Sequence, residues 1–194
     1  MKTEEKILDA AFELFSDRGY KVTTTKLIAE KAGVNEVTIF RHFNSKMNLF
    51  RRVIEQQAEG RKEIVVEEMP EPTGNLEKDL MKLGMKTHEV LMESSDFFKL
   101  LLSEVDRDPK LFQLISHVPE KFVEGFSMYL EAGKKKGTIR KDLDIEVATF
   151  TFLSFFFRAM IEKAFLGEGK IFKVSENEIR EHIDIFLEGI QDEG

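Results

Sequence analysis

The chain has 194 residues, of which 42% are hydrophobic and 34% are charged, and its formal net charge is −7. This composition is too apolar for a disordered chain, and the length allows one or two domains to bury a core. The absence of cysteine excludes disulfides, thiolate metal sites and cysteine nucleophiles, and it fits a reducing cytoplasm.

The N-terminal segment MKTEEKILDAAFELF interrupts its apolar residues with Glu, Asp and Lys, so we expect neither a secretory signal nor a transit peptide. The most apolar stretch, residues 147–157, ends at Arg158 and is shorter than the roughly 20 residues of a membrane-spanning helix. We therefore predict a cytoplasmic protein that does not interact with membranes.

Apolar residues recur every three or four positions from Ile7 to Phe15, which predicts a first helix that ends at Gly19. Thr24 is suited to cap a short second helix, because its hydroxyl can accept from a free backbone N–H of the first turn. Ile28 and Ala29 then face inward.

Gly33 supplies the backbone freedom for a tight turn, and Asn35 can cap a third helix with Ile39 and Phe43 on its inner face. Ser45 can cap a long fourth helix, which should end within the segment EEMPEPTGN at 67–75. Further helices are predicted at about 76–92, 96–105, 109–136, 145–166 and 175–190, with breaks at 106–108 and 167–169. No strand pattern competes, so the predicted fold is all-α.

The second and third helices have the spacing of a helix-turn-helix, with Ala29, Gly33 and Ile39 at the crossing, the turn and the inner face. The outer surface of the third helix is short-chained at its start and positive at its end, which suits a DNA major groove. Its residues are Asn35, Glu36, Val37, Thr38, Arg41 and His42.

Thr38 or Val37 can touch a thymine methyl group. Base edges can be hydrogen-bonded by any of three side chains, and the sequence leaves that choice open: Asn35, Glu36 or Arg41. Helix N-termini bind phosphate through hydroxyls, free N–H groups and positive charge, and the candidates there are Thr24, Thr25 and Lys46. Residues 1–55 carry ten Lys and Arg against eight Asp and Glu, although the rest of the chain is acidic.

The stretch TTTKLIAEKAGVNEVTIFRHFNSKMNLF, residues 23–50, resembles the N-terminal domain of the TetR family of repressors. That family's motif runs from a threonine cap through I-A-x-x-A-G-V to T-[LI]-[YF]-x-[HY]-F-x-[SN]-K-x-x-L. The resemblance implies that the family's DNA-facing positions are occupied by Thr24, Thr25, Lys26, Thr38, Phe40, Arg41, His42 and Lys46. Many relatives have tyrosine in place of Phe40, proline in place of Asn44, and an acidic pair in place of Met47 and Asn48.

The last two predicted helices carry more apolar surface than one face can bury, so they require a partner. In the TetR family the corresponding helices pair in a homodimer. The resemblance therefore implies a dimer interface at Phe150, Leu153, Phe157, Ile161, Ile179, Ile183, Phe186 and Ile190. Core packing is the alternative role for each phenylalanine.

A ligand pocket is expected among the helices of the second domain, with an unknown small apolar ligand. The candidate lining residues are His88, Met92, Phe97, Phe98, Leu101, Phe112, Phe122, Phe126, Tyr129 and Phe155, with Glu104, His117 or Arg158 as polar anchors. The eighteen phenylalanines and eight methionines equally suit an ordinary helical core.

The four histidines are scattered without metal-ligand spacing, and neither GFSMY at 125–129 nor GEGK at 167–170 completes a catalytic or phosphate-binding motif. We therefore expect no enzyme activity, no metal and no cofactor. A protein-controlled DNA-binding protein without an inducer and a pure protein-interaction module remain as alternatives.

The sequence thus predicts a three-helix DNA-binding domain at residues 1–47, joined by a long fourth helix to a ligand-binding and dimerisation domain at 48–194. The expected protein is a homodimeric repressor that binds a palindromic double-stranded DNA operator and is released by its ligand.

Overall fold

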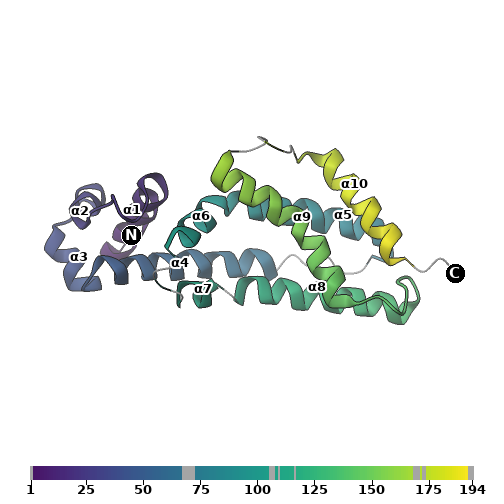
Figure 1. Cartoon of the computed structure of the whole chain (residues 1–194). Helices are drawn as coiled ribbons and strands as arrows, with labels where there is room; N and C mark the ends of the chain where they lie inside the picture. Colours follow the sequence, from purple (N-terminus) through teal and green to yellow (C-terminus); the bar gives the residue numbers. More distant parts are fainter. Residues whose placement is uncertain are drawn as a thin grey trace. The chain divides into compact units, whose positions relative to one another are not determined.

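The computed structural model describes residues 2–66, 73–104, 108, 110–115, 117–167, 171 and 174–191. Within these ranges there is no strand, and an isolated antiparallel bridge pairs Ile139 with Gln191. The predicted all-α fold is confirmed. The helices in Figure 1 are α1 (Thr3–Arg18), α2 (Thr25–Ala32), α3 (Glu36–Phe43), α4 (Lys46–Val66), α5 (Leu76–Glu93), α6 (Ser95–Glu104), α7 (Lys110–Ile115), α8 (His117–Lys136), α9 (Ile145–Leu166) and α10 (Glu176–Ile190).

The helix expected at 109–136 corresponds to α7 and α8. Helical residues lie on both sides of residue 116, which is outside the described part of the structure. The predicted breaks at 67–75, 106–108 and 167–169 fall largely outside the described residues.

None of the helices in the described part of the chain carries a stretch both long and apolar enough to span a bilayer.

The chain divides into two compact units. We call Met1–Arg61 with Asp96–His117 the N-terminal unit, and Lys62–Ser95 with Val118–Gly194 the C-terminal unit. This grouping places residues 96–117 with the first helices, whereas the sequence suggested a boundary after residue 47. The predicted domain boundary stays a prediction.

The N-terminal unit has an aromatic centre made by side chains from α1, the following turn and α4. The ring of Phe50 lies 5.3 Å from that of Phe15 and 5.0 Å from that of Tyr20. Thr23 is buried, and its hydroxyl shares its one proton between the carbonyls of Leu14 and Gly19, each 2.9 Å away. These contacts fix the turn that leads from α1 into α2.

The second stretch of the N-terminal unit packs into the same core through α6 and α7. Its buried residues are Phe97, Leu100, Leu101 and Leu111. Arg51 Nε on α4 donates to Asp108 Oδ2 at 2.6 Å, and this hydrogen bond lowers the pKa of the Asp108 carboxyl group. Residues 96–115 therefore belong to the same packed body as the helix-turn-helix.

The C-terminal unit is built from α5, α8, α9 and α10 around a second aromatic core. The Phe152 ring lies 4.7 Å from Phe126 and 5.3 Å from Phe186, which joins α8, α9 and α10. Gly84 on α5 lets this core close, because a Cβ there would lie 3.2 Å from Phe156 and 3.3 Å from Ile179.

A buried carboxylate fastens α5 to α8 in the same unit. Asp79 is 2% exposed and accepts hydrogen bonds from the Tyr129 hydroxyl at 2.9 Å and from the Thr73 hydroxyl and N–H at 2.6 and 2.9 Å. Burial and the bond to Asp79 raise the pKa of Tyr129. Tyr129 therefore acts as a structural donor in this arrangement.

The turn from α3 into α4 is a tight one centred on Asn44, whose φ is +62° and ψ −34°. The Ser45 N–H donates to the Phe43 carbonyl at 2.7 Å, so the turn is a γ-turn, a rare and strained conformation. Proline, common here in the TetR family, holds φ near −65° and cannot adopt it.

We therefore predict that Asn44→Pro lowers the free energy of unfolding by about 2–3 kcal/mol, because the turn must rebuild. Asn44→Gly, which accepts positive φ, should stay within about 1 kcal/mol of the parent. Urea unfolding followed by circular dichroism measures both values. A proline variant as stable as the parent would show that this turn is not required.

Candidate nucleic-acid interface

Three helix N-termini of the N-terminal unit carry side-chain caps, as the sequence predicted. Thr24 Oγ1 accepts from the Leu27 N–H of α2 at 3.2 Å. Asn35 Oδ1 accepts from the Val37 N–H of α3 at 3.0 Å. The Ser45 hydroxyl accepts from the Asn48 N–H of α4 at 3.1 Å. Other N–H groups of each first turn have no partner within the helix, which suits binding of phosphate oxygens.

The third helix has one buried and one exposed face. Ile39 and Phe43 are buried in the core of the N-terminal unit, whereas Val37 is 72% exposed and Phe40 45% exposed. Arg41 and His42 are also exposed, and Thr38 is half-buried. A helix with short or apolar side chains at its start and positive ones near its end is shaped to enter a major groove.

A hydrogen bond joins the start of α2 to the start of α3. Thr25 Oγ1 donates to Glu36 Oε1 at 2.6 Å, and both residues are half-buried. Glu36 accounts for the acidic first turn of α3. Sequence reasoning placed both residues at the interface but could not foresee the bond, since it depends on how the two helices cross.

Lys46 is held in a defined position at the first residue of α4. Its Nζ lies 4.2 Å from the centre of the Tyr20 ring and donates to the Lys21 carbonyl at 3.4 Å. Desolvation lowers the pKa of Lys46, and the nearby negative charge of Glu104 partly opposes that shift. The ammonium group has three donors, so it can also bind a phosphate oxygen. Lys26 is the second residue of α2, and its side chain is exposed.

The residues predicted to line a ligand pocket divide between the two units. Phe97, Leu101 and Glu104 lie in the N-terminal unit and are buried. The side chains of Phe112 and His117 lie outside the described part of the structure. Phe98 also lies in the N-terminal unit, partly buried against its core. The remaining candidates lie in the C-terminal unit, and they are His88, Met92, Phe122, Phe126, Tyr129, Phe155 and Arg158.

Within the C-terminal unit these candidates have defined packing partners. Phe122 and Phe126 belong to the core, and Phe155 stacks on His182 with a centroid distance of 4.4 Å and an interplanar angle of 7°. Burial lowers the pKa of His182. The assignment of these residues to a ligand pocket stays a prediction.

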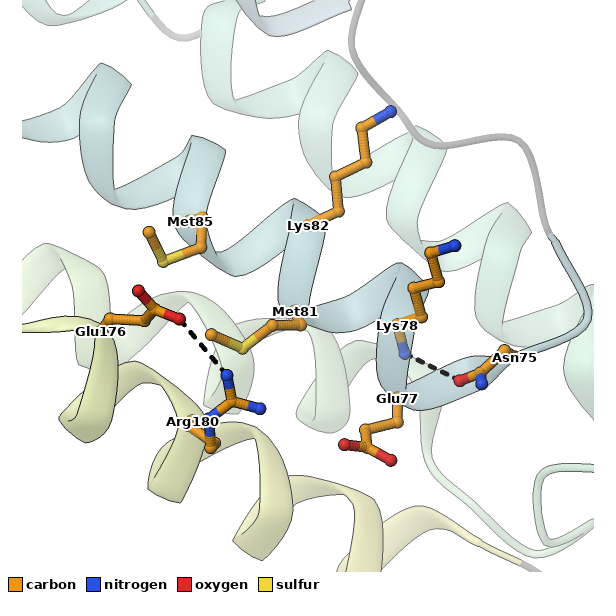
Figure 2. Close-up of a pocket in the computed structure, with 8 residues that line it drawn as sticks. All are labelled: Asn75, Glu77, Lys78, Met81, Lys82, Met85, Glu176 and Arg180. Atoms are coloured by element: carbon orange, nitrogen blue, oxygen red, sulfur yellow. Dashed lines mark hydrogen bonds and ion pairs between the residues drawn. The ribbon is translucent and has the colours of Figure 1, made fainter.

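A hollow of about 390 Å³ lies elsewhere in the C-terminal unit, between α5 and α10. Figure 2 shows Met81 and Met85 on α5 and the ion pair of Arg180 with Glu176, 3.3 Å apart, along α10. The other lining residues are Asn75, Glu77, Lys78 and Lys82. Sequence analysis did not single out this hollow, because its residues come from two helices that are far apart in the sequence.

The residues predicted to form a dimer interface separate into two groups. Five are buried in the core of the C-terminal unit: Leu153, Ile179, Ile183, Phe186 and Ile190. Phe150 is 55% exposed, Ile161 is exposed, and Phe157 is half-buried. The apolar stripe of α10 therefore faces its own unit, and the assignment of these residues to a dimer interface stays a prediction.

Sequence reasoning missed other exposed apolar residues on the same two helices. They are Val147, Phe165 and Leu166 on α9 and Ile185 on α10. Together with Phe150 and Ile161 they form what we call the exposed apolar stripe. Most of this stripe could have been identified from the sequence, because positions 147, 150, 154, 157, 161 and 165 fall on one face of a helix.

Comparisons with known proteins agree with this architecture. Residues 7–53 match the sequence profile of bacterial regulatory proteins of the tetR family, and residues 78–189 match that of the AefR-like transcriptional repressor C-terminal domain. The chain is 34% identical to the HTH-type transcriptional regulator YvkB of Bacillus subtilis, over 97% of each protein. It is 29% identical to the HTH-type transcriptional repressor KstR2 of Rhodococcus jostii, over 76% of this chain and 72% of that protein.

Solved structures are similar over the whole chain. A TetR-family transcriptional regulator from Mesorhizobium loti superposes with a TM-score of 0.76 at 24% identity, covering 98% of this chain and 97% of that one. The flavonoid-responsive regulator FrrA superposes with a TM-score of 0.72 at 23% identity, covering 99% and 98%. These two likenesses concern the fold.

The position of Lys46 leads to a prediction about DNA affinity. Lys46→Ala should weaken binding to all duplexes equally and reduce the slope of log affinity against log salt by about 0.9, the value for one lost phosphate contact. Fluorescence anisotropy over a salt series measures this. Lys46→Arg should keep the slope, and so should Lys135→Ala, which removes an exposed lysine on α8. A Lys46→Ala protein that selects different sequences with an unchanged slope would contradict the assignment.

Proposed function

This chain belongs to the TetR family of bacterial regulatory proteins, and we propose on that basis that it is a repressor that binds a palindromic operator as a homodimer and is released by a small apolar ligand. The family membership makes it a helix-turn-helix transcriptional regulator rather than an enzyme. Repression is supported by the similarity to KstR2, which is a repressor.

The observation that carries DNA binding is the two-sided character of α3. Its inner face is anchored by Ile39 and Phe43, so its outer residues are presented on a rigid support. The three capped helix N-termini and the held ammonium group of Lys46 supply groups for the phosphate backbone. Together these features support a DNA-binding head, meaning the helix-turn-helix of one subunit, that contacts phosphates with its helix N-termini and Lys46 and contacts bases with α3.

The exposed apolar stripe supports the homodimer. Four of its members, Val147, Phe150, Ile161 and Phe165, are large side chains on one face of α9, and exposed apolar surface of this kind marks interaction sites. A two-fold dimer uses the same surface on both subunits. Such a dimer would set two α3 helices in successive major grooves, roughly 34–36 Å apart, on an operator with matching symmetry.

The place of α6 in the N-terminal unit supports a route for induction. The chain passes from α5 of the C-terminal unit through Ser94 into α6, which shares its core with α4. We propose that ligand binding in the C-terminal unit shifts α6 and thereby alters the spacing of the two heads. A ligand can weaken DNA binding only through its different affinity for the two states. The name of FrrA, a flavonoid-responsive regulator, supports an apolar ligand as the first class to test.

The dimer gives a direct test. Phe150→Asp together with Phe165→Asp should yield a monomer in sedimentation velocity and lose most operator affinity, because each head alone makes half of the contacts. Met128→Asp changes an apolar residue on α8 that is more exposed than either phenylalanine, and this variant should stay dimeric. A double variant that remains a dimer, or a Met128→Asp monomer, would place the interface elsewhere.

Induction can be tested in two steps. A panel of apolar molecules is first screened for compounds that raise the melting temperature of the DNA-free protein, and these compounds are then tested for their effect on operator binding. A true inducer should weaken operator binding about 5-fold to 150-fold, and the operator should weaken compound binding by the same factor. Anisotropy and calorimetry measure the two factors. Compounds that bind tightly but leave operator affinity unchanged would favour control by a protein partner.

A further inference from the structure

The hydrogen bond between Thr25 and Glu36 assigns unequal roles to two residues of the interface. Thr25 is the first residue of α2 and Glu36 the first residue of α3, and their side-chain oxygens are 2.6 Å apart. Both helix N-termini carry partial positive charge, which stabilises a carboxylate at this point. Glu36 is therefore held on the DNA-facing side although DNA repels negative charge in general.

The bond commits the only proton of the Thr25 hydroxyl. A hydroxyl has one donor, so Thr25 cannot donate to a phosphate oxygen while it donates to Glu36. The backbone N–H groups of the first turn of α2 are available for phosphate instead. The side chain of Thr25 is thus better suited to position Glu36 than to hold the DNA backbone.

The three side chains considered for base recognition are also distinguished by the structure. Recognition helices contact bases with their N-terminal residues, which disfavours Arg41 near the end of α3. Asn35 accepts the capping bond through Oδ1, which ties its amide to the backbone of α3, so a bidentate contact with adenine would have to share that oxygen. Glu36 remains, and within the described residues its second oxygen, Oε2, accepts no hydrogen bond from the protein.

We propose that Glu36 reads one base of each operator half-site by accepting from an exposed amino group, with cytosine preferred, and that Thr25 is the residue that positions it. A carboxylate is only an acceptor, so it matches the N4 amino group of cytosine and is repelled by the acceptor atoms of guanine and by O4 of thymine. Adenine is second, because its amino group adjoins the acceptor N7. This inference rests on the proposed function of the same surface.

The test is selection from a randomised duplex library by the intact protein and four variants, followed by sequencing. The parent should enrich cytosine at one position of each half-site, about tenfold over guanine or thymine. Glu36→Gln gains a donor and should shift that position alone toward adenine. Thr25→Val should weaken the preference at the same position and leave the others, whereas Thr25→Ser should keep it. The double variant Glu36→Gln with Thr25→Val should match Glu36→Gln alone.

The outcomes separate this inference from the function it rests on. A parent protein that enriches no sequence overturns both. A parent motif that Glu36→Gln leaves unchanged overturns the role of Glu36 only. A Thr25→Val protein with an unchanged motif and uniformly lower affinity for all duplexes makes Thr25 a phosphate contact and overturns its positioning role. Thermal unfolding of each variant verifies that the fold is retained.

Discussion

The burial of Ile39 and Phe43 is the constraint on which the interface depends. These two residues fix one face of α3 in the core that also contains Phe15 and Phe50, so the opposite face must remain outside. The exposure of Val37 follows from that rotation, and the Asn35 cap makes Glu36 the first residue of the helix. If α3 were rotated by a quarter-turn about its axis, polar residues of its outer face would become buried and Phe43 would become exposed.

A second constraint joins distant parts of the chain into one body. Arg51 and Asp108 are 57 residues apart, yet their ion pair and the neighbouring apolar residues of α6 and α7 attach residues 96–115 to α4. The helix-turn-helix therefore shares a core with a segment that continues directly into the C-terminal unit. A close-packed core can adopt only a few distinct arrangements of its side chains, and this property suits a switch between two conformations.

Local features were predictable from the sequence, and features set by tertiary packing were not. The caps at Thr24, Asn35 and Ser45 depend on neighbours within three residues, so residue type and spacing sufficed. The apolar periodicity of α10 predicted that one face of the helix is buried, but it did not predict what covers that face. The same periodicity results whether Ile183 packs on its own unit or on a second subunit. The Thr25–Glu36 bond spans two helices and has no signature in spacing.

Hydrogen–deuterium exchange of the intact protein, with and without a duplex that the protein itself has selected, tests the central claim most directly. The account predicts that DNA slows exchange of backbone amides in the first turns of α2 and α3, at residues 25–28 and 36–39. Slowing confined to residues 118–191, with α3 unchanged, would contradict it.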